Sequence, residues 1–198
     1  MLGVFLLASA AAYSQNSDKK AWKRYRKERR KEFLQKERSP LDRRSVRRVR
    51  YFAYAPEWRV PAKVDLIAEG ATVAFATSSG VPRDYVEYAT LTFGAADDTH
   101  TLTVYRSANA SRLPAAYQDY LFLPFTDATN GSTSYGGGRY LDLRITDLRV
   151  ENFFLDFNRA YNPYCAYAEG YSCPVPPPNN RLPLAIVAGE CNFAATFE

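Results

Sequence analysis

The chain has 198 residues, of which 46% are hydrophobic and 15% aromatic, and its formal net charge is +5. This length and apolar content permit a buried core, and they favour one globular domain with an appendage over two domains. Fifteen Tyr and twelve Phe, together with twelve Pro and ten Gly, favour strands and turns. The composition therefore predicts a single, mostly β domain.

The amino terminus carries an apolar run, residues 4–12, that is too short to span a bilayer. It leads into Ala12-Tyr13-Ser14, which places small residues at the two positions that signal peptidase reads. We predict a signal peptide over residues 1–14, no transmembrane segment, and export to the periplasm or the medium. A disordered or buried amino terminus is the alternative, because no Lys or Arg precedes the apolar run.

Charge is distributed unevenly along the chain. Residues 18–50 contain 16 of the 26 Lys and Arg but only five acidic residues, a net charge of +11, whereas the rest of the chain has a net charge of −6. Residues 19–38 lack Gly and Pro and are rich in helix formers. An aromatic stripe recurs there at helical spacing, formed by Trp22, Tyr25, Arg29 and Phe33. We predict a basic helical arm over residues 15–50, with a helix that ends at Ser39-Pro40.

Two interpretations of this basic arm are open. Its positive field attracts anions, so the arm could contact an anionic surface or another polyanion. Alternatively, it is a solvated helix that Trp22 and Phe33 dock onto the acidic body of its own chain. Specific nucleic-acid recognition is not expected, because no motif that presents side chains to base edges is visible.

The strand signals lie after the arm. Alternation and turn residues predict strands over residues 62–67, 72–77, 85–93, 99–106, 139–145 and 152–158. The first two are expected to form a hairpin around Glu69-Gly70, and the next two a second hairpin. Residues 51–198 are therefore predicted to form one all-β domain, a small antiparallel barrel or sandwich, which follows the N-terminal basic α-helix.

The predicted strands over residues 139–145 and 152–158 each carry one aspartate, Asp142 and Asp156, on the polar face. If these strands are antiparallel neighbours around a turn near Arg149, Asp142 lies directly across from Asp156. Like charges in this position require a shared proton, a metal ion or an arginine. The pair would belong either to a buried Asp–Arg network that holds the fold together or to a binding or catalytic cleft.

Two loops near these strands have unusual composition. The three glycines at 136–138 allow a tight strand entry or close approach to a ligand. Outside the cytosol, Cys165 and Cys173 are most simply a disulfide. A zinc site would require Cys191 and the lone His100 as further ligands, and a cysteine nucleophile would require His100 as its base. We predict the disulfide, with no metal and no cofactor.

This part of the chain contains several uncommon sequence motifs in a fixed order, at residues 125–129, 134–142, 155–163 and 173–186. With them, residues 51–190 resemble the domain of unknown function 1684 family. The residues that match the family pattern are Asp127, Thr129, Tyr135, Gly136, Gly138, Arg139, Asp142, Asp156, Asn158, Arg159, Asn162, Cys165, Cys173, Asn180 and Arg181. The resemblance implies little about chemistry, and it does not extend to the basic arm or to Cys191.

Two functions from different classes are compatible with these residues. The first is an exported module that binds a small polar ligand or a partner on a β scaffold. The second is a hydrolase that uses an aspartate pair, Asp142 with Asp156 or Asp127 with one of them, as acid and base or as metal ligands. We predict the binding module. Its candidate ligand-binding residues are Asp127, Thr129, Tyr135, Arg139, Asp142, Asp156, Asn158, Arg159, Asn162 and Arg181.

Overall fold

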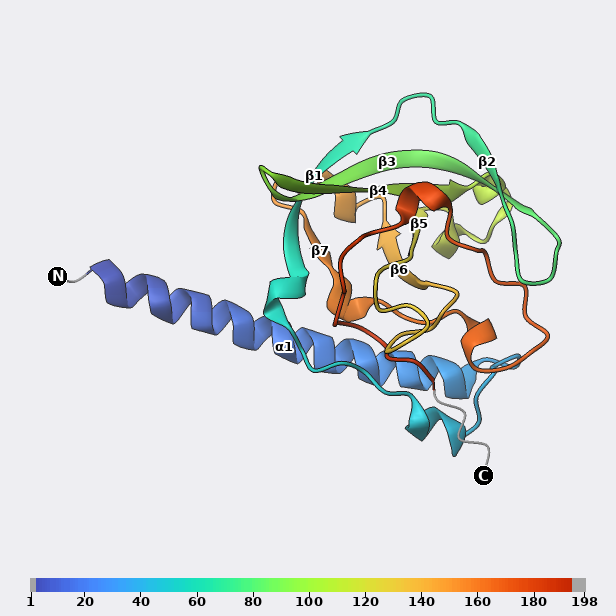
Figure 1. The fold of residues 1–198 in the computed structure, drawn as a ribbon, viewed down its shortest axis with the longest axis horizontal. Helices are drawn as coiled ribbons and strands as arrows, with labels where there is room; N and C mark the ends of the chain where they lie inside the picture. The colour runs from blue at the N-terminus through green and yellow to red at the C-terminus, as the bar shows by residue number, and fades with distance from the viewer. Residues whose placement is uncertain (1–2, 194–198) are drawn as a thin grey trace.

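The computed structural model describes the backbone of residues 3–193 and the side chains from Asn16 to Phe193. One long helix, α1 (Gly3–Gln35), precedes an antiparallel sheet that curls into a half-barrel (Figure 1). The strands are β1 (Arg59–Leu66), β2 (Thr72–Phe75), β3 (Arg83–Ala95), β4 (Asp98–Ser107), β5 (Tyr120–Phe125), β6 (Arg139–Arg144) and β7 (Phe154–Asp156). The prediction of an all-β body with an N-terminal helix is confirmed. Among the described residues, no helix combines the length and apolar character needed to cross a membrane.

The sheet is organised around β3, which has 13 residues. The strand order is β6-β5-β4-β3-β1-β7, and β2 pairs with β3 outside this order. The expected hairpin of β3 with β4 is confirmed, with Ala95 opposite Asp98 at its turn. The main hydrophobic cluster takes alternate residues of these two strands, such as Leu91 and Leu102, because successive side chains of a strand point to opposite faces.

The hairpin predicted for residues 62–67 and 72–77 is wrong. These segments form β1 and β2, but each of them pairs with β3. β1 pairs with the later residues of β3, and β2 pairs with the first four residues of β3. β3 is long enough to pair with both strands at different positions. Gly70 lies in the connection, where an added Cβ would be 1.8 Å from the carbonyl oxygen of Glu87. The connection therefore passes directly against β3, and its turn at Ala68-Glu69 does not pair β1 with β2.

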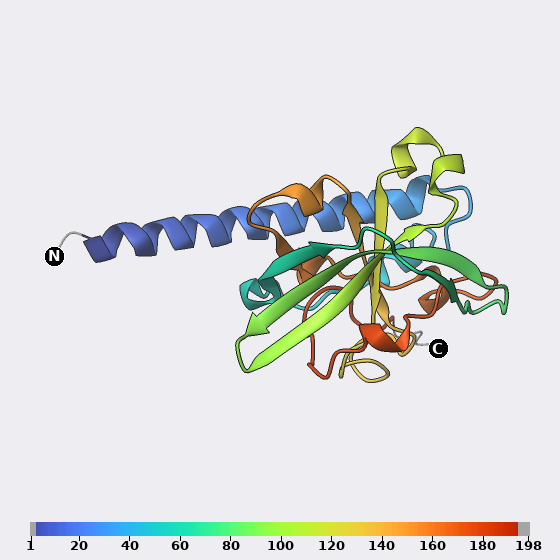
Figure 2. The same ribbon diagram turned by 90° about the horizontal axis from the view of Figure 1, so that it is seen from above.

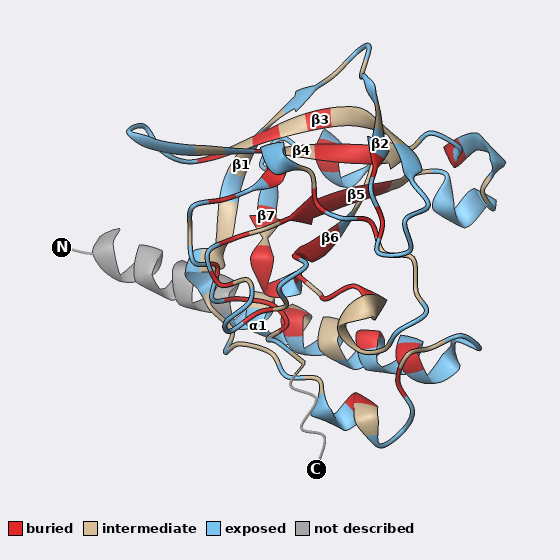
Figure 3. Ribbon diagram, turned by 45° about the vertical axis from the view of Figure 1, so that its right-hand side comes forward, coloured by how far each residue is buried: buried red, intermediate tan, exposed pale blue. Residues whose placement is uncertain are grey.

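Two apolar clusters lie on opposite faces of the sheet. The larger combines one face of β3, β4, β5 and β6 with Leu155, Phe157 and Ile186 from the later chain, all fully buried. The smaller is aromatic and contains Phe122 and Tyr140 from β5 and β6. Figure 3 shows buried stretches on β4, β5 and β6. Both faces of β5 are covered, so β5 appears in the sequence as a nearly continuous apolar run.

The second half of α1 lies against the body (Figure 2). Trp22 and Phe33 are buried, and Phe33 contacts the rings of Tyr164 and Tyr167. The helix ends at Gln35, a few residues before the predicted stop at Ser39-Pro40. The arm is therefore docked along the stripe seen in the sequence. The predicted signal peptide, residues 1–14, falls where the side chains are outside the described residues, and it stays a prediction.

Gly138 at the entry to β6 supplies a test of local backbone strain. Its φ is +87°, and an added Cβ would lie 2.7 Å from the carbonyl oxygen of Phe125. We expect Gly138→Ala to lower the free energy of unfolding by about 3 kcal/mol, because the left-handed conformation and the contact both oppose a side chain. Urea denaturation measures this loss.

Gly131 is the matched control for this substitution. Its φ of +81° is also left-handed, but nothing lies within 4 Å of its added Cβ. Gly131→Ala should therefore lose only about 1 kcal/mol, the cost of the backbone conformation alone. Equal losses for the two variants would contradict the close approach at Gly138.

Candidate functional site

The predicted residues Asp127, Thr129 and Arg139 meet in a buried network. Arg139 Nη2 donates a hydrogen bond to Asp127 Oδ2 over 2.7 Å, and neither side chain is exposed. Arg139 also donates to the carbonyl oxygens of Ile186 and Ala188. Asp127 Oδ1 accepts from the Thr129 hydroxyl and the Thr129 amide. This network joins the loop before β6 to the carboxyl-terminal segment, and it leaves the carboxylate no free face for a ligand.

A hollow with a volume of about 480 Å³ lies next to this network. It is lined by Asp127, Ala128, Pro178, Arg181, Leu182 and Pro183. The structure thus brings together two predicted residues, Asp127 and Arg181. Because the Asp127 oxygens are bound within the protein, Arg181 is the charged group that this hollow presents.

The remaining predicted residues are dispersed. Asn158 is buried, and its side chain binds both the amide and the carbonyl of Ala55. Asn162 is buried and donates to the carbonyl oxygen of Cys191. Arg159 is exposed and lies 3.5 Å from Asp156, whereas Tyr135 is half-buried. Asn158 and Asn162 therefore hold loops in place, although the buried Asn162 Oδ1 has no hydrogen-bond partner among the described atoms.

The predicted Asp142–Asp156 pair is wrong. β6 pairs with β5, so Asp142 is opposite Phe122, whereas β7 pairs with β1, so Asp156 is opposite Arg59. The connection from β6 to β7 contains the turn Asp147–Arg149 and leaves the sheet, so it does not close a hairpin.

Asp142 has a different set of partners from those predicted. Its carboxylate is exposed and accepts hydrogen bonds from the Tyr120 and Tyr161 hydroxyls. Burial, followed by the charge of Asp142, raises the pKa of both tyrosines. These hydroxyls therefore stay protonated and act as donors to Asp142.

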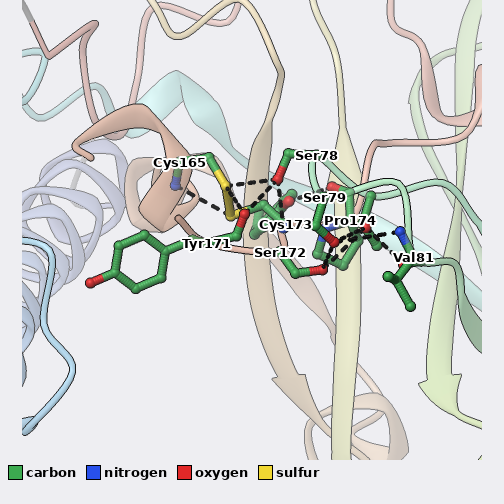
Figure 4. Close-up of a disulfide and its surroundings, with 10 residues drawn as sticks. Ser78, Ser79, Val81, Cys165, Tyr171, Ser172, Cys173 and Pro174 are labelled. Carbon is green, nitrogen blue, oxygen red and sulfur yellow. Dashed lines mark hydrogen bonds between the residues drawn. A yellow bond between two sulfur atoms is a disulfide. The ribbon is translucent and has the colours of Figure 1, made fainter. Parts of the chain in front are cut away.

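The disulfide Cys165–Cys173 is confirmed, with a Cα–Cα distance of 6.3 Å. Figure 4 shows how this loop holds the β2–β3 connection: Ser78 Oγ accepts from the Cys173 amide over 3.0 Å, and Ser79 Oγ donates to Ser172 Oγ over 2.7 Å. The bond removes both thiols from the zinc and nucleophile alternatives. No group of three potential metal ligands occurs within the described part of the chain.

Sequence reasoning missed Glu190, a carboxylate with no exposed surface. It accepts hydrogen bonds from the Tyr51 hydroxyl over 2.8 Å, the Asn162 amide over 2.9 Å and the Tyr167 hydroxyl, and it lies 4.0 Å from Arg29 Nε of α1. Burial, followed by the Glu190 charge, raises the pKa of Tyr51 and Tyr167. No pattern in the sequence marks this glutamate, because its partners lie between 23 and 161 residues away.

A groove lies between α1 and the segment 46–51, with a cavity volume of about 330 Å³. We call it the basic groove. It is lined by Lys23, Arg26, Lys27, Arg30, Phe33, Val46, Arg47, Val49 and Tyr51. Five of these nine residues are cationic and none is acidic. The sequence indicated the helical side of this groove but not the second wall, which the turn Ser45–Arg48 brings alongside the helix.

Charges on α1 are separated onto two flanks. Lys23, Lys27 and Arg30 recur every three or four residues and share the groove flank. On the opposite flank, Asp18 pairs with Arg59 of β1, and Glu28 pairs with Lys31. None of the five groove cations forms an ion pair within the described residues, so their charge is not neutralised by the protein.

Arg26 lies at the inner wall of the basic groove. Its guanidinium carbon is 4.6 Å from the ring centroid of Trp22 and 4.4 Å from that of Tyr51. The buried Nε of Arg26 has no hydrogen-bond partner among the described atoms. Cation–π contact with two rings holds the guanidinium in place and uses none of its N–H donors, which leaves donors available for an acceptor in the groove.

A family model for a protein of unknown function, DUF1684, matches residues 44–191. The chain belongs to the DUF1684 family. The match begins within the predicted basic arm and ends at Cys191, so it includes Arg47, Tyr51 and Glu190 but not α1. The search of curated proteins found no match.

A solution NMR structure of an uncharacterized protein from Haloarcula marismortui is similar to this DUF1684 protein. The two are 33% identical, with a TM-score of 0.65. The alignment covers 89% of this chain and 97% of the other. The likeness therefore extends beyond the residues that the family model matches.

The Asp127–Arg139 ion pair predicts a large mutational effect on this DUF1684 protein. Arg139→Met should lower the free energy of unfolding by about 3 to 5 kcal/mol, because it leaves the Asp127 carboxylate buried without its charge partner. Urea denaturation measures the loss, and the exposed Arg181→Met is the control, with an expected change within about 0.5 kcal/mol. Similar losses for both variants would contradict the structural role of the pair.

The cysteines predict a specific alkylation pattern. Without reductant, the unfolded protein should take up one alkyl group, at Cys191, and after reduction it should take up three. In the folded protein, burial raises the pKa of Cys191, so less thiolate is present and alkylation near neutral pH should be slower than after unfolding. Mass spectrometry gives the counts; three groups without reductant would exclude the disulfide.

Proposed function

We propose that this DUF1684 protein is an exported binding module that holds a phosphate-bearing anion in the basic groove. The observation that carries the proposal is the convergence of five cations on one cavity that has no acidic residue in its lining. A concave site of uniform sign concentrates counter-ions and accelerates their binding. Phosphate groups match arginine and lysine donors especially well, through charge-assisted hydrogen bonds.

The geometry of the groove supports an anion with an oxygen-rich surface. Lys23, Lys27 and Arg30 approach from the helix, and Arg47 approaches from the opposite wall. Arg26 lies against the aromatic rings of Trp22 and Tyr51, which hold its guanidinium by cation–π contact. Cations on two walls can contact several oxygens of one ligand at once, which favours a tetrahedral oxyanion over a single carboxylate.

The polar cluster predicted from the sequence does not support the same function. Asp127, Arg139, Asn158 and Asn162 are buried, and all four side chains are engaged in internal hydrogen bonds. The hydrolase alternative depended on an aspartate pair, Asp142 with Asp156 or Asp127 with one of them. The strand pairing separates Asp142 from Asp156, and the Asp127 carboxylate is bound to Arg139 and Thr129. The binding-module interpretation therefore moves from the polar cluster to the groove formed by the basic arm.

Export forms the other part of the proposal. The disulfide Cys165–Cys173 is typical of oxidising compartments, which include the periplasm and the extracellular medium. The predicted signal peptide at 1–14 agrees with this location. In such a compartment the protein would meet free phosphate compounds and the anionic groups of cell envelopes.

Isothermal titration calorimetry with inorganic pyrophosphate at about 0.1 M salt, where the Debye length is about 10 Å, tests the groove. We expect the double variant Lys27→Gln/Arg30→Gln to bind pyrophosphate about tenfold more weakly, equivalent to about 1.4 kcal/mol, because two uncompensated donors are lost. Both residues are exposed on the helix, so the fold should be retained.

The matched control is Lys36→Gln/Lys63→Gln, which removes the same charge from residues outside the groove lining. It should bind pyrophosphate within about twofold of the unmodified protein, since neither side chain lines the groove and salt screens exposed charges. The proposal fails if pyrophosphate does not bind, or if the control variant loses as much affinity as Lys27→Gln/Arg30→Gln.

A further inference from the structure

We infer that the ligand is a linear chain of phosphate groups that lies along α1, so that the basic groove holds one part of it. This inference rests on the proposed function, because it extends the same site. Its starting point is that the cationic row does not stop where the cavity stops. Lys19 and Lys20 lie one turn before Lys23, and neither lines the groove.

The row follows from helical geometry. Lys20, Lys23, Lys27 and Arg30 are three or four residues apart, so their side chains fall on the same flank of α1. With a rise of about 1.5 Å per residue, the row extends over about 15 Å of the helix. A single phosphate or pyrophosphate cannot contact the whole of such a row, whereas a chain of phosphates can.

The acidic residues of α1 are placed where they do not interrupt this row. Asp18 lies 3.8 Å from Arg59, and Glu32 lies 3.4 Å from Arg29, both on the side of the helix away from the groove. The row cations Lys19, Lys20, Lys23, Lys27 and Arg30 are all exposed, and none forms an ion pair within the part of the chain that the structure describes. A polyanion approaching this flank therefore meets uncompensated positive charge along its length.

The second wall of the groove determines where along α1 the phosphate chain binds most strongly. Arg47 faces the groove from the turn Ser45–Arg48, which runs beside the later part of the helix. Near Arg30, cations on both walls can contact the phosphate chain, whereas Lys19 and Lys20 can contact it from one side only. The ligand should consequently bind most strongly at the groove and gain additional contacts toward the amino terminus of α1.

The test compares two probes, inorganic pyrophosphate and medium-chain inorganic polyphosphate, over a range of salt concentrations. Polyphosphate should bind more tightly than pyrophosphate per chain, and its affinity should fall more steeply with salt, because more phosphates release counter-ions. The variant Lys19→Gln/Lys20→Gln should reduce the slope of log affinity against log salt by about 1.4 for polyphosphate, at about 0.7 per phosphate contact. It should leave pyrophosphate binding unchanged.

The control variant Lys36→Gln/Lys63→Gln carries the same loss of charge elsewhere and should leave both slopes unchanged. If it reduces the polyphosphate slope as much as Lys19→Gln/Lys20→Gln, binding follows net charge alone and the inference is wrong. If pyrophosphate binds in the groove but polyphosphate gains nothing from Lys19 and Lys20, the proposed function stands and the linear ligand is excluded. If neither probe binds, both proposals fail.

Discussion

The buried carboxylate of Glu190 is the contact on which the arrangement of the arm depends. It accepts hydrogen bonds from Tyr51, Tyr167 and the Asn162 amide, and it lies 4.0 Å from Arg29 of α1. A buried charge is stable only when it is paired and hydrogen-bonded. These four partners come from the helix, from the segment after the arm and from the disulfide-closed loop region. One carboxylate therefore fixes how these segments meet.

The basic groove is a consequence of this docking. Tyr51 donates to Glu190 and also forms one side of the groove, where Arg26 stacks on its ring. Trp22, Arg29 and Phe33 face the body, and this orientation turns Lys23, Lys27 and Arg30 toward the second wall. Bringing so many cations together is unfavourable in itself, and burial of the aromatic stripe with the Arg29–Glu190 contact offsets it. An anion in the groove would relieve the same repulsion.

Local patterns in the sequence were sufficient to predict the elements whose partners are close in the chain. The aromatic stripe of α1 follows from helical periodicity, the β3–β4 hairpin from alternation around a short turn, and Cys165–Cys173 from their spacing in a chain that we predict to be exported. The same reasoning gave the wrong neighbours for β1, β2, β6 and β7. Strand pairing there is decided by long-range packing: β3 is long enough for two partners, and both faces of β5 are covered, so alternation in β5 gives no register.

Only the helical side of the candidate site could be predicted from the sequence, again because the rest depends on long-range contacts. The cations of the arm are visible in the composition, but a groove requires a second wall, and its position depends on Tyr51 reaching Glu190 from 139 residues away. The polar residues that looked functional, Asp127 and Arg139 above all, instead form a buried internal ion pair. Their prominence in the sequence reflects the strict demands of a buried ion pair, which constrain residue type as strongly as a ligand does.

The central claim, that the uncompensated cations between α1 and the segment 46–51 form the binding site, is tested most directly by an NMR titration of the isotope-labelled protein with pyrophosphate. Saturable chemical-shift changes should be largest at residues 23–30 and at Arg47 and Tyr51, and small in the β3–β4 hairpin. Changes centred on Asp142 or on the hollow at Arg181, or no saturable change at all, would contradict the account.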